Sequence, residues 1–164
     1  MKSIVLTGMM GSGKTSVGKI LAQYLDFDYV DVDDEIEKRE SKSISEIFEQ
    51  DGEEYFRHIE AKIIKELIKD NCVVALGGGA FEDFNTREFL LKNSTIVYLQ
   101  TSAKWIYKRI KNDSQRPLLK DNMSIDKIDE IINLRKNNYE KAHIVINTDN
   151  KNINQVAEEI QQWL

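Results

Sequence analysis

The segment that most constrains the fold is a glycine-rich run near the N-terminus, Gly8-Met9-Met10-Gly11-Ser12-Gly13-Lys14-Thr15. It fits the pattern G-x-x-x-x-G-K-[ST], follows a β-rich run at residues 3–7 and opens an amphipathic stretch at residues 14–24. In such a strand–loop–helix unit, backbone N–H groups and the positive end of the helix converge on phosphate oxygens. The sequence therefore predicts a binding site for ATP or GTP, formed by Gly11, Ser12, Gly13, Lys14, Thr15 and Ser16.

Two side chains of this run, Lys14 and Thr15, are predicted to have separate roles. Lys14 supplies a positive charge to the terminal phosphates, and the hydroxyl of Thr15 can reach Mg²⁺. The alternative is a glycine-rich turn before a helix, which the position between a strand and an amphipathic helix makes a poor explanation.

The rest of the chain alternates short β-rich runs with longer helical stretches. Strands are predicted at residues 3–7, 29–32, 72–76, 95–99 and 143–147. Helices are predicted at residues 14–24, 34–40, 44–49, 53–69, 86–92, 103–111, 125–138 and 154–163. The clearest strands, such as Ile4-Val5-Leu6, are apolar on both faces, which is typical of a parallel sheet covered by helices on both sides. We predict an α/β fold, a three-layer sandwich with a five-stranded parallel sheet, whose strand order one sequence does not reveal.

Length and composition exclude several classes of protein. A chain of 164 residues suits one domain spanning residues 1–164. Its apolar runs are too short to span a membrane, and residues 3–7 are too short for a secretion signal, so we expect a cytoplasmic protein without membrane contact. The net charge of −5 gives no support to nucleic-acid binding. We expect a monomer, and we expect the single cysteine, Cys72, to be buried in its apolar run.

An acidic segment ends the second predicted strand. Asp31 and Asp33 are two residues apart, so both side chains are expected on the same side, beyond the carboxyl end of the sheet. If the first and second strands are neighbours, one carboxylate could join the Mg²⁺ shell and the other could accept a hydrogen bond or proton from an acceptor hydroxyl. Asp34, with Glu37 three residues later, is predicted to cap the next helix.

Three consecutive glycines, Gly77, Gly78 and Gly79, directly follow the third predicted strand. Glycines at a strand end pack no side chain, so their expected use is close approach of the backbone to a ligand. A flexible turn is the alternative.

Arginine is sparse, at six of the 23 basic residues, so its positions are informative. Arg57, Arg109, Arg116 and Arg135 lie on four separate predicted elements and could each bind a carboxylate or phosphate through two parallel hydrogen bonds. Arg39 and Arg87 are predicted to be solvated surface charges. Arg116 falls in a polar segment at residues 112–124, which could be either a mobile lid or an ordinary connection.

Together these motifs resemble those of the shikimate kinase family, in the family's order and spacing. The match runs from the first strand to the C-terminal helix and rests on the phosphate loop, Asp31-Val32-Asp33, Glu35-Ile36-Glu37-Lys38-Arg39, Gly52-Glu53-Glu54-Tyr55-Phe56-Arg57, the glycine triplet, Arg116-Pro117-Leu118-Leu119 and Arg135-Lys136-Asn137-Asn138-Tyr139. The resemblance implies a P-loop, nucleoside-monophosphate-kinase-like fold with a lid at about residues 112–124. It also implies ATP- and Mg²⁺-dependent phosphorylation of the shikimate 3-hydroxyl, a step toward chorismate and the aromatic amino acids.

The resemblance further implies a role for each matching residue. Asp31, with Thr15, would help to hold Mg²⁺, and Asp33 would bind shikimate hydroxyls as the candidate base. Arg57 and Arg135 would clamp the shikimate carboxylate, and Gly77, Gly78 and Gly79 would line the acceptor pocket. Arg116 would close over the phosphates with the lid, and Arg109 would pack near adenine.

The chain departs from the family pattern at two places. Leu76 precedes the glycine triplet where threonine is frequent, and Asn147-Thr148-Asp149-Asn150 replaces a loop that often supplies a proline against adenine. Two rival functions stay open beside this resemblance: another small-molecule kinase of this fold, acting on gluconate or a nucleoside monophosphate, and a nucleotide-binding module without catalysis.

Overall fold

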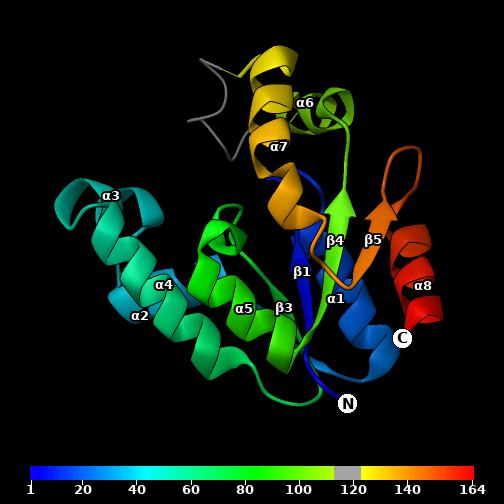
Figure 1. The fold of residues 1–164 in the computed structure, drawn as a ribbon, viewed down its shortest axis with the longest axis horizontal. Coiled ribbons are helices and arrows are strands. Elements are labelled where there is room, and N and C mark those ends of the chain that lie inside the picture. The colour runs from blue at the N-terminus through cyan, green and yellow to red at the C-terminus, as the bar shows by residue number, and fades with distance from the viewer. Residues whose placement is uncertain (113–122) are drawn as a thin grey trace.

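The computed structural model describes residues 1–112 and 123–164. Five strands form one sheet in the order β2-β3-β1-β4-β5, with every neighbouring pair parallel (Figure 1). The strands are β1 (Ile4–Thr7), β2 (Asp28–Asp31), β3 (Cys72–Ala75), β4 (Thr95–Gln100) and β5 (Ile144–Asn147). The helices are α1 (Lys14–Leu25), α2 (Val32–Glu40), α3 (Ile44–Gln50), α4 (Glu53–Leu67), α5 (Phe84–Asn93), α6 (Ala103–Lys111), α7 (Ile125–Tyr139) and α8 (Ile153–Trp163), with a 3₁₀ turn η1 (Ala80–Glu82). The predicted five-stranded parallel α/β sandwich is confirmed.

Helices cover both faces of the sheet, which explains why the central strands β1 and β3 are buried at every position. Val5 faces one side and packs in a cluster with Ile36 of α2 and Ile64 of α4. Ile4 and Leu6 face the other side, in a cluster that also contains side chains of α1 and α8. Because successive residues of a strand point to opposite faces, a strand between two helical layers must be apolar at every position.

A third apolar cluster lies at the carboxyl end of the sheet, where Figure 1 shows α6 and α7 beyond the strand arrowheads. Met9 of the glycine-rich loop packs there against Ile106 and Ile110 of α6 and Ile128 of α7. This cluster anchors the two helices beside the loop, so side chains of α6 and α7 can reach the predicted site.

The start of α2 differs from the sequence prediction. The second strand was predicted at residues 29–32 with Asp34 as the helix cap, but β2 ends at Asp31 and α2 begins at Val32. Asp31 is the N-cap: its Oδ1 accepts hydrogen bonds from the backbone N–H groups of Asp33 (3.0 Å) and Asp34 (3.5 Å). The predicted cap at Asp34 is wrong because the chain passes from strand to helix without a turn, so the last strand residue satisfies the first helical N–H groups.

Arg87 also differs from its prediction as a solvated surface charge. Only 5% of it is exposed, and its Nη1 donates hydrogen bonds to the backbone carbonyls of Phe81 (2.9 Å) and Glu82 (3.1 Å). Arg87 therefore satisfies carbonyls of the η1 turn from inside the protein. Arg39 is exposed as predicted, and it forms ion pairs with Glu35 and Glu66.

Two predictions about apolar segments can be compared with the structure. Cys72 is buried in β3, as expected. Within residues 1–112 and 123–164, no helix combines the length and the apolar character that crossing a membrane requires.

Candidate functional site

The glycine-rich loop between β1 and α1 has the geometry expected of a phosphate cradle. Gly11 (φ +76°) and Gly13 (φ +99°) adopt left-handed backbone conformations that favour glycine. Gly13 is the N-cap of α1 and provides no side chain to bond the first helical N–H groups. The hydroxyl of Ser12 is buried and has no hydrogen-bond partner among the described residues. Both the N–H groups and this hydroxyl are donors that a phosphate could satisfy.

Lys14 lies inside the curve of this loop. Its ammonium group donates hydrogen bonds to the carbonyl oxygens of Gly8 (2.7 Å) and Met9 (3.0 Å). These contacts hold a positive charge at the mouth of the cradle, as the motif predicts.

Thr15 and Asp31 meet at one edge of the cradle. The Thr15 hydroxyl donates a hydrogen bond to Oδ2 of Asp31 (2.9 Å), while the other oxygen of Asp31 caps α2. Mg²⁺ prefers one or two protein oxygens completed by phosphate oxygens and water, so this pair fits such a metal. In the described part of the chain, no group of three or more acidic, histidine or cysteine side chains offers a metal site made of protein alone.

Asp31 lies beside the glycine-rich loop for a different structural reason than the one predicted. The prediction required β1 and β2 to be neighbours, but β3 lies between them in the sheet. Helix α1 instead bridges the gap, since it packs against β2: a Cβ on Gly18 of α1 would lie 2.6 Å from the Tyr29 ring. Thr15, in the first turn of α1, is thereby brought to Asp31.

The glycine triplet after β3 makes room for three functional side chains. A Cβ on Gly77 would lie 2.7 Å from Oδ1 of Asp33 and 3.1 Å from Oε1 of Glu60. A Cβ on Gly79 would lie 2.7 Å from Nη2 of Arg57. In the structure, the side chains that approach these glycines closely are the protein's own carboxylates and guanidinium, and the close approach to a ligand stays a prediction.

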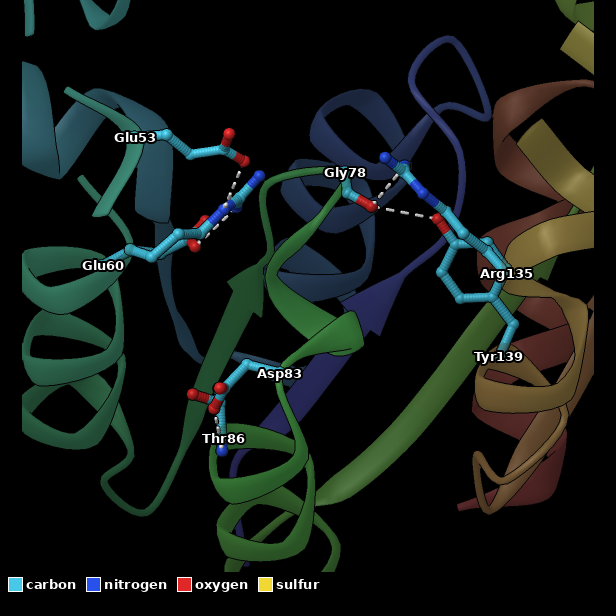
Figure 2. A network of polar contacts seen from close by, with 8 residues as sticks. Glu53, Glu60, Gly78, Asp83, Thr86, Arg135 and Tyr139 are labelled. Atoms are coloured by element: carbon cyan, nitrogen blue, oxygen red, sulfur yellow. Dashed lines mark hydrogen bonds and ion pairs between the residues drawn. The ribbon is translucent and has the colours of Figure 1, made fainter. Parts of the chain in front are cut away.

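From the opposite side, α7 reaches the middle glycine. Nη1 of Arg135 and the hydroxyl of Tyr139 both donate hydrogen bonds to the carbonyl of Gly78, at 2.9 Å and 3.0 Å (Figure 2). Figure 2 shows Arg135 and Tyr139 on one side of Gly78 and Glu53 and Glu60 of α4 on the other. The triplet thus joins α4 and α7 across the carboxyl end of the sheet.

Glu60 is a site residue that the sequence reasoning missed. It is 3% exposed, and its Oε2 accepts a hydrogen bond from Nη1 of Arg57 (2.8 Å). Its Oε1 is buried without a hydrogen-bond partner among the described residues. A signal was available: Glu60 is four residues from both Phe56 and Ile64, on the apolar face of α4, where an unpaired acid is expensive.

Two acidic groups of the site, Asp33 and Glu60, have raised pKa values. Burial, together with the like charge of Asp31, raises the pKa of Asp33 to about 6, and the positive charge of Lys14 opposes this. Burial also raises the pKa of Glu60, against the lowering effect of Arg57. A carboxylate with a raised pKa beside a phosphate cradle is a candidate for proton transfer.

Arg109 lies against the cradle from α6. Its Nη1 donates hydrogen bonds to the carbonyls of Gly11 and Ser12, both at 3.2 Å, and burial lowers its pKa. Arg116 and most of the predicted lid lie outside the described residues. Among the residues that are described, the structure brings together the cradle, Asp31, Asp33, Arg57, Arg135 and the glycine triplet at one end of the sheet.

Comparison with known proteins agrees with this arrangement. The sequence model of shikimate kinase matches residues 10–164. The shikimate kinase of Sulfurihydrogenibium sp. (strain YO3AOP1) is 45% identical over 161 residues, which are 98% of this chain and 96% of that protein. That of Persephonella marina is 42% identical over 98% of this chain and 97% of its own length. The solved structure of the Acinetobacter baumannii shikimate kinase in complex with shikimate superposes with a TM-score of 0.92 and 36% identity, covering 99% of this chain and 92% of that one. The chain belongs to the shikimate kinase family.

Proposed function

We propose that this protein transfers the terminal phosphoryl group of ATP to the 3-hydroxyl of shikimate, giving shikimate 3-phosphate and ADP. The observation that carries the proposal is the glycine triplet, which brings Asp33, Arg57 and Arg135 to one strand end beside the phosphate cradle. The solved relative with 36% identity that holds shikimate supports the choice of acceptor.

The two arginines suit an acceptor that carries a carboxylate. Arg57 comes from α4 and Arg135 from α7, so an acid between them would receive hydrogen bonds from two sides. Both guanidinium groups are already held, Arg57 by Glu60 and Arg135 by the carbonyl of Gly78. A site organised for a carboxylate rejects analogues that lack it, by up to about 10⁴-fold where polar groups would be left unpaired.

Phosphoryl transfer requires alignment and charge neutralisation more than covalent help from the protein. Lys14 and the N–H groups of the loop would bind the phosphates, and Asp33 would orient the acceptor hydroxyl and take its proton as the new O–P bond forms and ADP leaves. Arg116 would add positive charge over the phosphates, as the family motif implies. Thr15 and Asp31 would hold Mg²⁺, which supplies charge neutralisation between phosphate oxygens.

The test is a panel of acceptors in which ADP release is measured through an enzyme-linked assay. Shikimate, gluconate, a nucleoside monophosphate and water alone are each offered with ATP and Mg²⁺. We expect release of ADP with shikimate far above the rate with water. Turnover with gluconate or a nucleotide but not with shikimate would contradict the proposal, and tight ATP binding without turnover on any acceptor would favour a non-catalytic module.

A further inference from the structure

The peptide group that joins Gly78 to Gly79 lies where the glycine triplet meets the side chains that would bind the acceptor. Because neither glycine has a side chain, this peptide can rotate more freely than an ordinary one. It follows β3 and precedes the η1 turn, so the hydrogen bonds of the sheet do not fix it. Its orientation therefore depends on the contacts that its carbonyl group makes.

Two side chains of α7 hold this carbonyl. Nη1 of Arg135 and the hydroxyl of Tyr139 donate hydrogen bonds to it at 2.9 Å and 3.0 Å, which occupy both lone pairs of the oxygen (Figure 2). The two residues are four apart and share one face of the helix. Under the proposed function Arg135 must also bind the acceptor, so Tyr139 is the contact that anchors the carbonyl independently of the acceptor.

Tyr139 is itself firmly held. Its side chain is fully buried, and its ring stacks on that of Tyr98 of β4, with ring centroids 4.7 Å apart and an angle of 20° between the planes. Burial raises the pKa of Tyr139, against the lowering effect of Arg135, so the phenol stays protonated and can donate at neutral pH. Tyr139 therefore ties the Gly78 carbonyl to the sheet through a stacked pair of aromatic rings.

The direction of the carbonyl determines the direction of the next N–H group. The peptide bonds of the described residues are all trans, and in a trans peptide the C=O and N–H groups point opposite ways. Since the Gly78 carbonyl points at α7, the N–H of Gly79 points away from α7, toward the side on which Figure 2 shows α4. In the described part of the chain this N–H donates to no backbone acceptor. A donor that faces the space between the two helices is available to an oxygen atom of a ligand.

We propose that Tyr139 is a positioning residue for the acceptor: by anchoring the Gly78 carbonyl to the sheet, it keeps the Gly79 N–H directed at an oxygen of the bound acceptor. Without the Tyr139 hydroxyl, Arg135 alone would hold the carbonyl, and the same guanidinium would also have to serve the acceptor. The inference rests on the proposed function for the identity of the acceptor.

The two stacked tyrosines provide a matched pair of variants for the test. Tyr139→Phe removes the hydroxyl and keeps the ring, and Tyr98→Phe does the same to its partner, whose hydroxyl is not one of the two donors to Gly78. Shikimate affinity is measured by calorimetry without nucleotide. Tyr139→Phe should weaken binding by about three- to tenfold, as expected for one hydrogen bond, and Tyr98→Phe should bind within about twofold of the wild type. In steady-state kinetics Tyr139→Phe should raise the KM for shikimate and leave the KM for ATP unchanged.

Nuclear magnetic resonance can observe the peptide itself, because the triplet contains the only adjacent glycines in the chain. In protein labelled with [1-¹³C,¹⁵N]glycine, a spectrum that correlates each amide with the preceding carbonyl selects only Gly78 and Gly79, which sequential assignment tells apart. The Gly79 amide signal then carries the carbonyl shift of Gly78. Tyr139→Phe should move this carbonyl signal, and Tyr98→Phe should move it much less. Shikimate should move the Gly79 amide signal of the wild type.

Three results would each overturn the inference: equal losses of shikimate affinity in the two variants, an unchanged Gly78 carbonyl signal in Tyr139→Phe, or no response of the wild-type Gly79 amide to saturating shikimate. The last measurement needs no variant, so it stands even if Tyr139→Phe folds poorly. A wild type that binds shikimate but transfers no phosphoryl group to it would contradict the proposed function and leave these binding results standing.

Discussion

Gly79 leaves the space that the Arg57 guanidinium occupies, since a Cβ on Gly79 would lie 2.7 Å from Nη2 of Arg57 and 3.1 Å from its Nη1. The backbone at Gly79 is right-handed (φ −103°, ψ −5°), a conformation that alanine adopts without strain. Any effect of an added methyl group at this position must therefore act through its collision with Arg57.

We predict that Gly79→Ala raises the KM for shikimate by about tenfold or more, with the KM for ATP nearly unchanged. Arg57→Ala should raise the same KM by about ten- to a hundredfold, because a hydrogen bond to a charged group contributes about 1.5–3 kcal/mol. Steady-state kinetics with each substrate varied in turn measure both effects.

The double variant, Gly79→Ala with Arg57→Ala, tests whether both substitutions weaken shikimate binding through the same Arg57 contact. If Gly79→Ala works by displacing Arg57, adding it to Arg57→Ala should change the KM for shikimate little further. Additive effects on the logarithm of KM would show that Gly79 matters for another reason.

Glu60 and Glu53 offer a matched comparison, since both carboxylates pair with Arg57. Glu60 is buried and 2.8 Å from Nη1, whereas the Glu53 side chain is 70% exposed and 3.8 Å from Nε (Figure 2). We predict that Glu60→Gln raises the KM for shikimate several-fold, because a neutral amide orients Arg57 less strongly than a buried carboxylate. Glu53→Gln should have almost no effect, because exposed ion pairs contribute little. Equal effects of the two substitutions in the same assay would refute the positioning role of Glu60.

The features of this fold and site that depend on a local sequence pattern could be predicted from the sequence. The phosphate loop is recognisable because its glycines, Lys14 and Thr15 follow one another along the chain. The parallel sheet is recognisable because Ile4, Val5 and Leu6 make β1 apolar on both faces. Glu60 was missed although its partner Arg57 lies one helical turn away on α4. Arg87 was misjudged because its partners, the carbonyls of Phe81 and Glu82 in the η1 turn, are placed beside it only by folding. The strand order, which places β3 between β1 and β2, likewise depends on packing of whole layers.

Asp31 has two tasks that a conservative change can separate. One oxygen caps α2 and the other meets the hydroxyl of Thr15. Asparagine is about as good an N-cap as aspartate, so Asp31→Asn should keep α2 intact while removing a charge next to the metal position. We predict that the Mg²⁺ concentration for half-maximal activity rises about tenfold or more, with the circular dichroism spectrum unchanged. Chelation of divalent cations by EDTA should abolish wild-type turnover, and an unchanged Mg²⁺ dependence in Asp31→Asn would show that Asp31 does not hold the metal.

The charged carboxylate of Asp33 is expected to promote turnover and to destabilise the folded protein. If its carboxylate takes the acceptor proton, Asp33→Asn should lower kcat by about 10²- to 10⁴-fold while changing the KM for ATP little. An unchanged kcat would mean that Asp33 is not the base.

The same substitution should stabilise the folded protein at neutral pH. The pKa of Asp33 is raised from 3.8 in an unperturbed group to about 6 in the fold, because burial and Asp31 disfavour its charge. Below about pH 4 the group is protonated in both states and contributes nothing, whereas above about pH 6 its charged form in the fold costs about 1–3 kcal/mol. The difference in free energy of unfolding between Asp33→Asn and the wild type should therefore be near zero at pH 4 and grow as pH rises to 7. Urea denaturation of both proteins in EDTA, without nucleotide, measures this difference, and a constant difference across that range would show that Asp33 titrates at an ordinary pKa.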